Sequence, residues 1–369
     1  MKVIEFDNSD ITHPYFKNKS KCFVLNDVFI RKDGDWLCLY HNKKRLNGFV
    51  NRNVNNGDTL HWHGSAEPGL YYGEDQPSLT VDEEIDSLFL LYDDYEWQYG
   101  HFVMDCMPKM WYWIKLLETD DTIKICLNNN IVSPCYTSDL SKKVDYPTSF
   151  STEYLELYLA RYNLILKNHI KFLNKNTTYF IKKLVLPIPF QSVDTSVYPN
   201  RFWEMYDIIG RDIDKSNEYN NIYVSRRDVN NKNWMHYRVL LNEEEIIDKL
   251  QNIDFKEIKL LEHSVENKIK IFKSANKIIQ TVGSNCYNLV FIRENTKCGI
   301  VYHPQYACWS EHLKYIIVQK KSKYFEYKND CEIVENYRDY YPENYNELKK
   351  KIDAPWIFKN VKKLIEDFI

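Results

Sequence analysis

From about residue 216 onward, short apolar segments alternate with amphipathic ones, and this alternation constrains the fold more than any other feature of the chain. Helical spacing of apolar residues predicts helices at 242–252 and 264–275. Strands and helices that alternate at this interval form βαβ units, which build a parallel sheet with right-handed crossovers. The chain is therefore predicted to be an α/β protein. The predicted strands lie at 221–226, 255–261, 276–282 and 298–304.

The length of 369 residues indicates about two domains. The first 80 residues show short strands and turns, including a hairpin signal at Asp33–Gly34, and a helix is predicted over about 97–117. A final helix, with Asp353 as its expected N-cap, is predicted to pack back on the N-terminal domain. The expected parts are an N-terminal domain at 1–215, a C-terminal Rossmann-like domain at 216–345 and a C-terminal helix at 346–369.

The composition limits the expected cellular location and binding partners of the protein. A net charge of −3 gives no electrostatic case for binding nucleic acid. No segment has the apolar length of a membrane span or the pattern of a signal peptide, so a cytoplasmic protein is expected. Nine cysteines without a C-x-x-C pair are expected to be reduced packing residues. Abundant Asn, Lys, Ile and Tyr indicate an AT-rich genome, as in some giant viruses, which would place the protein in the host cytoplasm or the virion.

An aromatic-rich segment at 99–113 contains two polar side chains that suit a buried helix poorly. His101 and Asp105 are four residues apart, so a helix places them on one face, one turn from each other. Burying an acid and an imidazole is costly unless they pair or act in catalysis. Two interpretations stay open: a structural hydrogen bond, or a general base with its orienting partner. A metal pair is not favoured, because no third ligand is apparent.

Arginines follow a predicted strand, at the end where ligands bind in doubly wound sheets. Arg226 and Arg227 come directly after the strand, and Arg238 precedes the next helix. Guanidinium groups bind phosphate oxygens bidentately and stay charged at any relevant pH, so a diphosphate is a fitting ligand. The alternative is a set of surface arginines paired with Asp228 and Glu243.

A glycine turn follows the predicted strand at 276–282. Gly283, Ser284 and Asn285 lead from this strand into a helix. Glycine permits a tight turn, and the first amides of a helix attract an anion. The G-x-G-x-x-G dinucleotide pattern is missing, so an ordinary glycine turn remains the alternative.

Taken in order, three segments resemble blocks of glycosyltransferase family 61. The segment GHFVMDCMP resembles the family's H-[WF]-x-x-D-x-x-P block. The segment from YVSRRD to YRVLLNEEE resembles its S-R block with a later arginine and an N-E helix start. The segment HSVENKIKIFKSANKIIQTVGSNCYNLVFI resembles its third block. The chain is thus similar to this family, including its DUF563-like members, over about residues 87–325, and a giant-virus member fits the composition.

The resemblance implies a GT-B fold, in which two Rossmann-like domains face a cleft and the C-terminal one holds the donor. It implies an inverting hexosyl- or pentosyltransferase that moves a sugar from a nucleotide sugar, often a UDP sugar, to a hydroxyl of a glycan or protein. Asp105 is favoured as the base, with His101 orienting it or the acceptor, and His101 as the base is the alternative. No metal or other cofactor, nucleic acid or membrane partner is expected, and a homodimer stays an open option. The implied donor-binding residues are Ser225, Arg226, Arg227, Arg238, Gly283, Ser284 and Asn285.

The chain departs from the family pattern in ways that leave alternatives. Val282 replaces a usual histidine, Asn267 replaces a usual glutamine, and the arginines are spaced more widely. Pyruvyltransferases also use a metal-free, arginine-rich cleft between two domains, so an enzyme of that kind acting on glycans is one alternative. The other is a nucleotide- or glycan-binding relic that has lost turnover.

Overall fold

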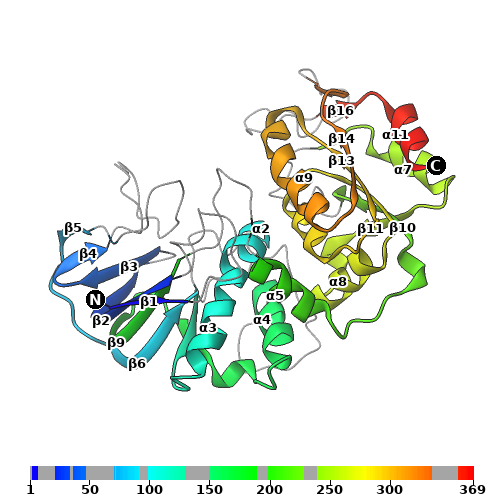
Figure 1. Cartoon of the computed structure of the whole chain (residues 1–369). Coiled ribbons are helices and arrows are strands. Elements are labelled where there is room, and N and C mark those ends of the chain that lie inside the picture. The colour runs from blue at the N-terminus through cyan, green and yellow to red at the C-terminus, as the bar shows by residue number, and fades with distance from the viewer. Residues whose placement is uncertain are drawn as a thin grey trace. The chain divides into compact units, whose positions relative to one another are not determined.

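The computed structural model describes residues 2–6, 21–33, 36–46, 70, 72–91, 99–128, 149–188, 198, 200–227, 239–334 and 356–369. The chain divides into two compact units (Figure 1). We expected the boundary after residue 215, and the structural division lies after Ile209. The N-terminal unit comprises Met1–Ser133 and Leu140–Ile209, and the C-terminal unit comprises Pro134–Asp139 and Gly210–Ile369.

A nine-stranded mixed sheet forms the centre of the N-terminal unit. Its order is β5-β4-β3-β2-β9-β6-β7-β8, and β1 also pairs with β2. The predicted hairpin is confirmed, because β2 and β3 pair in antiparallel fashion with Asp33 opposite Trp36. The strands are β1 (Lys2–Glu5), β2 (Lys21–Asp33), β3 (Trp36–His41), β4 (Lys44–Leu46), β5 (Tyr72–Asp75), β6 (Glu83–Leu90), β7 (Lys124–Asn128), β8 (Ile170–Leu173) and β9 (Thr178–Pro187).

Strand β6 lies at the point where the order in which the chain adds strands to the sheet reverses. It pairs in parallel with β7 on one side and with β9 on the other. The chain leaves β6 through a helical segment to reach β7, whereas the later strand β9 returns to the opposite side of β6. In α/β sheets such a reversal is a topological switch point, and ligands bind beyond the carboxyl ends of the strands beside it.

The described part of the N-terminal unit contains one predicted helical run, at about 97–117, and two further helices. Ser149 is the N-cap of one of them, α4, because its hydroxyl accepts from the Thr152 amide in a reciprocal capping box. The helical segments are α2 (Tyr99–His101), the π turn η1 (Phe102–Cys106), the 3₁₀ turn η2 (Met107–Lys109), α3 (Met110–Leu117), α4 (Phe150–Ala160), the 3₁₀ turn η3 (Leu166–Asn168) and α5 (Asn200–Gly210).

The C-terminal unit confirms the predicted alternation of strands and helices. Its five strands are all parallel, in the order β11-β10-β12-β13-β14. The chain runs from β10 outward to β11 and then back past β10 to β12, so the switch point lies between β10 and β12. The strands are β10 (Asn221–Ser225), β11 (Lys256–Lys259), β12 (Lys277–Thr281), β13 (Lys297–Val301) and β14 (Lys323–Tyr327), and a separate pair is formed by β15 (Cys331–Ile333) and β16 (Trp356–Phe358).

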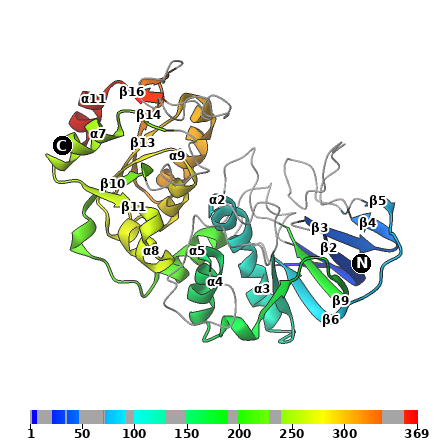
Figure 2. The ribbon, with the colours of Figure 1, turned by 180° about the vertical axis from the view of Figure 1, so that it is seen from behind.

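Helices cover both faces of the parallel sheet (Figure 2). On one face, α7 and α11 pack with the sheet residues Tyr223, Ile279 and Tyr327 in a single buried cluster. Helices α8 and α9 pack from the other side. The helical segments are η4 (Asn217–Tyr219), α7 (Glu243–Gln251), η5 (Leu260–Glu262), α8 (Val265–Ser274), η6 (Ser284–Phe291), η7 (Pro304–Trp309), α9 (Ser310–Gln319) and α11 (Val361–Phe368).

The expectation that the last helix packs on the N-terminal domain is corrected by these contacts. Leu364 and Phe368 of α11 are fully buried in the C-terminal cluster. Gly299 of β13 makes room for this, since a Cβ there would lie 2.9 Å from the Phe368 ring. The helix is capped by Asn360, whose side chain accepts from the Lys363 amide, while the expected cap Asp353 lies outside the described residues.

Candidate active site

The predicted pair His101 and Asp105 is formed, on a helical run that changes its winding. His101 ends α2, and Asp105 lies in the π turn η1, which closes with the Met107 amide donating to the Phe102 carbonyl. Pro108 in the next turn lacks an amide hydrogen, which disrupts the α-helical hydrogen-bond pattern at this point. Isolated π turns inside helices are frequent at functional sites.

The geometry of the pair gives its two members different exposures. His101 Nδ1 lies 2.7 Å from Asp105 Oδ2. The His101 side chain is 37% exposed, whereas that of Asp105 is 10% exposed. A buried carboxylate bonded to one ring nitrogen fixes the orientation of the imidazole. The imidazole is therefore the member of the pair that is more accessible to a substrate.

An aromatic shell fixes the π turn in place. The Tyr206 hydroxyl of α5 donates to the Val103 carbonyl inside the turn. The Phe102 ring packs edge-on against Phe150 of α4, with ring centroids 5.6 Å apart. Phe102, Val103 and Tyr206 are all buried, so the unusual winding is supported by packing on the following helices.

In the C-terminal unit, the two predicted anion-binding segments meet at the switch point. Arg226 follows β10 and Gly283 follows β12, and these strands pair in parallel. A Cβ built on Gly283 would lie 1.9 Å from Nη1 of Arg226 and 3.0 Å from its Cζ, so the guanidinium lies directly on the glycine backbone. Gly283 has an extended backbone with φ of 164°, so it is the space for Arg226 that requires glycine here.

The glycine turn leads into the 3₁₀ helix η6. Gly283 is the N-cap, and Ser284 and Asn285 occupy the first turn, where amide hydrogens lack intrahelical acceptors. The Asn288 side chain donates to the Asn285 carbonyl at 2.9 Å and tightens this turn. A guanidinium beside the start of a helix presents positive charge and amide donors to one position, which suits an anion.

Glu243 supports the loop that carries Arg226, and the sequence prediction missed this role. Its carboxylate accepts from the Arg226 amide at 3.1 Å and from the Tyr223 hydroxyl at 3.0 Å. Glu243 is buried, and burial raises its pKa although hydrogen bonds from Arg226, Tyr223 and Ser225 act to lower it. Its position at the start of the predicted helix was visible in the sequence, where we considered it only as the ion-pair partner in the alternative of surface arginines.

Two other predicted donor-binding residues make contacts within the C-terminal unit. Arg227 forms a bidentate pair with Glu257 of β11, with Nε and Nη2 at 3.1 and 2.8 Å from the carboxylate. Its guanidinium fork is thus engaged inside the unit. Ser225 is fully buried, and its hydroxyl accepts from the Arg227 amide at 3.1 Å, which holds the turn after β10. Arg238 lies outside the described residues.

Two polar side chains at the end of β12 were not among the site residues predicted from the sequence. Gln280 is fully buried and Thr281 is 3% exposed. Neither the amide atoms of Gln280 nor the hydroxyl of Thr281 has a hydrogen-bond partner in the described part of the chain. Buried polar groups are normally satisfied, so these two mark the strand end beside Gly283 as a place for a polar ligand or ordered water.

A parallel sheet with an arginine and a helix start at its switch point is the arrangement of α/β enzymes that bind anionic cofactors and substrates. A family model described as Glycosyltransferase 61 matches residues 99–299, which is more than half of the chain. The chain therefore belongs to the glycosyltransferase 61 family, whose members use a sugar donor and an acceptor. No curated protein matches the chain.

Membrane-spanning helices and clustered metal ligands are both absent from the described residues. No helix there has the length and apolar character needed to cross a bilayer. No group of three or more His, Cys, Asp or Glu side chains in the same residues is arranged to hold a metal ion. Seven cysteines in the described ranges are free thiols, six of them buried, which agrees with their expected packing role.

Proposed function

We propose that this protein is an inverting glycosyltransferase that moves a sugar from a nucleotide sugar, expected to be a UDP sugar, to a hydroxyl of a glycan or protein. The observation that carries the proposal is Arg226 lying on Gly283 at the start of η6. When the glycosidic bond breaks, the leaving diphosphate gains negative charge, and a fixed guanidinium with helix-start amides stabilises it. Donor binding is thereby assigned to Arg226, Gly283, Ser284 and Asn285.

We assign the role of general base to His101, with Asp105 as its orienting partner. Asp105 was the favoured base from sequence, but its low exposure and its bond to Nδ1 suit an orienting role better. The imidazole would take the proton of the acceptor hydroxyl as that oxygen attacks the anomeric carbon. Attack from the side opposite the leaving group inverts the configuration.

The proposed reaction requires a GT-B arrangement, in which both units present their groups to one pair of substrates. Each unit contains parallel strands. In each unit the candidate site follows a strand that borders the switch point of the sheet. Because a guanidinium can supply the positive charge, the proposal includes transfer without a metal ion. The proposal also includes a homodimer and a location in the cytoplasm or the virion.

A thermal-shift screen with nucleotide sugars tests the donor assignment. A ligand that binds only the folded state at about 100 times its Kd adds roughly 2.7 kcal/mol of stability. We expect a UDP sugar to raise the melting temperature of the wild-type protein and not of Arg226→Ala. Comparison of hexose with pentose donors then distinguishes hexosyl from pentosyl transfer.

Product mass separates the proposal from its alternatives. Incubation with the stabilising donor and a mixture of glycans should add one sugar to an acceptor. Addition of a pyruvyl group from phosphoenolpyruvate would instead identify a pyruvyltransferase. A donor that binds but is neither transferred nor hydrolysed would identify a non-catalytic relic.

A further inference from the structure

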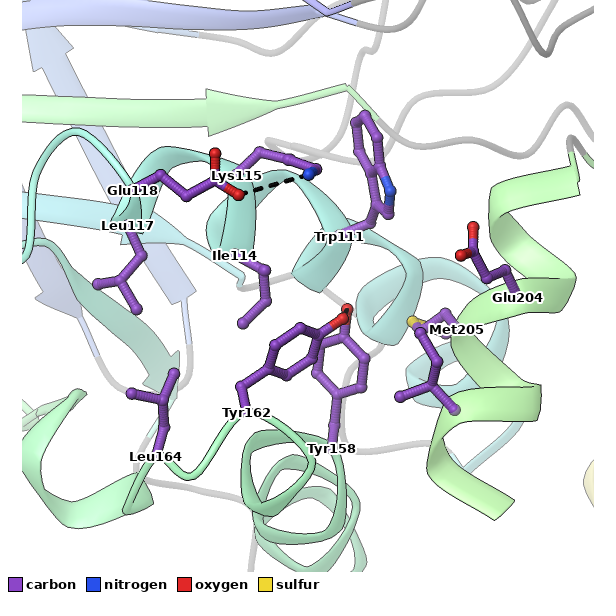
Figure 3. Close-up of a pocket in the computed structure, with 11 residues that line it drawn as sticks. Trp111, Ile114, Lys115, Leu117, Glu118, Tyr158, Tyr162, Leu164, Glu204 and Met205 are labelled. Atoms are coloured by element: carbon purple, nitrogen blue, oxygen red, sulfur yellow. Dashed lines mark hydrogen bonds and ion pairs between the residues drawn. The ribbon is translucent and has the colours of Figure 1, made fainter. Parts of the chain in front are cut away.

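Apart from the candidate site residues, a pocket lies wholly within the N-terminal unit, between α3, α4 and α5 (Figure 3). Its volume is about 380 Å³. Small-molecule sites in proteins span roughly 300–1,000 Å³, so this pocket can hold a ligand of one or two rings. The proposed catalytic residues His101 and Asp105 do not line this pocket, and neither do the proposed donor-binding residues.

The lining combines a flat aromatic surface with inward hydroxyl groups. Tyr158 and Tyr162 of α4 and the following turn point their hydroxyls into the pocket (Figure 3). Their rings meet edge to face at 5.3 Å and their hydroxyl oxygens are 3.4 Å apart. Tyr158 is buried and Tyr162 is 37% exposed, so one presents mainly its hydroxyl and the other also presents its ring. Burial raises the pKa of Tyr158 well above its ordinary value, which keeps its phenol neutral.

Charge at the rim limits the kind of ligand. Lys115 and Glu118 neutralise each other at 3.4 Å. Glu204 of α5 lines the opposite side, and within the described residues no hydrogen bond or ion pair engages its carboxylate. Among the side chains that line the pocket, the remaining charge is one carboxylate, which disfavours phosphates and other anions. It offers acceptors to hydroxyl groups, because an ionised carboxylate only accepts hydrogen bonds.

We propose that this pocket binds a neutral saccharide ring. A pyranose or furanose ring has an apolar C–H face that packs on aromatic and aliphatic side chains such as Tyr162 and Ile114. Its hydroxyls, which both donate and accept, match the Tyr158 hydroxyl and the Glu204 carboxylate. An aliphatic chain would leave those polar groups unsatisfied, and a nucleotide would bring phosphates to a negative rim.

If the proposed transferase function holds, the bound ring belongs to the acceptor glycan. Trp111, which lines the pocket, follows His101 by ten residues on one helical run, or roughly 15 Å along the axis. The pocket would therefore hold a part of the acceptor several units away from the reacting hydroxyl. Longer glycans would gain affinity from this second contact, as linked binding sites do.

The binding test uses the intact protein and an array of neutral oligosaccharides built from hexose, pentose and N-acetylhexosamine units. We expect the wild type to bind a subset of them. Tyr162→Ala should weaken that binding about tenfold, through one lost ring contact and one lost hydrogen bond. Ile208→Trp, which fills the pocket from α5, should also weaken it and guards against a loss caused by misfolding of the first variant.

Two controls separate this pocket from the transfer site. Tyr72→Ala removes a similarly exposed tyrosine, 41% exposed on β5 of the same unit, and should leave glycan binding unchanged. His101→Ala should strongly lower the rate of transfer and keep glycan binding, so a failure of the proposed reaction and a failure of the proposed pocket give different results. No bound glycan, or equal binding by wild type, Tyr162→Ala and Ile208→Trp, would overturn the proposal. Glycan binding that disappears in His101→Ala would also overturn it, because the ligand would then sit at the transfer site.

Discussion

The two units assemble their candidate sites in different ways. In the N-terminal unit, His101 and Asp105 are near neighbours on one helical run, and their contact follows from local winding. In the C-terminal unit, Arg226 and Gly283 are far apart in sequence and meet only because β10 and β12 pair in parallel. Each site nevertheless follows a strand that borders the switch point of its own sheet. The difference teaches that spacing reveals a local pair, whereas a distant pair requires knowledge of strand order.

Replacing the base should have the largest effect and tests the assignment inside the local pair. His101→Ala should lower the rate of transfer by roughly 10²–10⁴-fold, the usual range for a positioned base, while donor binding stays near wild type. Asp105→Asn keeps the size and a hydrogen bond to the ring, so we expect a smaller loss. The measurement is kcat at saturating donor and acceptor.

The relative size of the two losses decides between the structure and the sequence prediction. If Asp105→Asn loses as much activity as His101→Ala while His101→Gln retains most of it, Asp105 is the base, as the sequence favoured. If neither variant loses activity, the pair is structural.

The distant contact should be sensitive to one added methyl group. In Gly283→Ala the new Cβ occupies the position of Nη1, so the Arg226 guanidinium must move away while the fold stays intact. We expect transfer to fall by about 10²-fold, comparable to loss of one preorganised donor to a developing negative charge. Gly210→Ala is the matched control, because its Cβ would meet only Ile269 and Phe291 at ordinary distances of 3.7 and 3.9 Å.

A double-mutant cycle shows whether the methyl group acts through the arginine. Once Arg226→Ala has removed the guanidinium, Gly283→Ala should cause little further loss, since coupled residues are not additive. Full additivity of the two effects would mean that Gly283 contributes to transfer independently of Arg226.

The sequence predicted these elements unequally, for physical reasons. Strand and helix periodicity located β10, β12 and most helices, because burial of one face imposes a fixed spacing. The π turn was missed because an i, i+4 pattern does not distinguish π from α winding. Helix α11 was assigned to the wrong unit because its apolar stripe fits any hydrophobic surface, and only the room at Gly299 reveals its partner. Arg226 and Arg227 looked equivalent in sequence, and only Glu257 on the neighbouring strand separates their roles.

Glu243→Gln should have an intermediate effect on donor binding at the Arg226–Gly283 site. The Arg226 amide and the Tyr223 hydroxyl both donate to Oε1, and a neutral amide oxygen accepts such bonds more weakly than a carboxylate oxygen does. We expect the donor KM to rise about tenfold at neutral pH with a smaller change in kcat, an effect of roughly one lost hydrogen bond.

The pH dependence of this effect has a definite sign. Because burial raises the pKa of Glu243, its carboxylate takes up a proton at higher pH than an exposed glutamate. The wild-type donor KM should therefore increase as pH falls through that raised pKa, and the KM of Glu243→Gln should not follow. Its contribution to stability has the opposite slope, since a raised pKa favours the folded state at low pH and that benefit is lost as pH rises. Parallel KM profiles for the two proteins would count against the positioning role.

Asp120 provides the opposite pH response in the N-terminal unit. Burial acts to raise its pKa, but hydrogen bonds from Lys183, Thr122 and Ser87 outweigh this and lower the pKa to about 2. Stability from this group is present above its unfolded value, near 3.9, and is lost as pH falls through about 2. Asp120→Asn should lower the free energy of unfolding by about 2 kcal/mol at pH 7 and by almost nothing near pH 2. Chemical denaturation checks this, and a constant difference at all pH values would contradict it.

The smallest expected effect is none at all, on removal of divalent metal. A metal ion in a sugar transferase would neutralise the departing diphosphate. Arg226 and the first amides of η6 offer the same stabilisation at the distant site, and the guanidinium charge does not titrate. Transfer measured with excess EDTA should therefore equal transfer without it, and Arg226→Lys should recover only part of the activity of the wild type, because an ammonium cannot reproduce a bidentate fork. Loss of activity in EDTA with recovery on adding Mn²⁺ would mean that a metal ion, and not Arg226, stabilises the departing diphosphate. The candidate metal ligands would then be His101, Asp105 and the acidic residues that precede them in sequence.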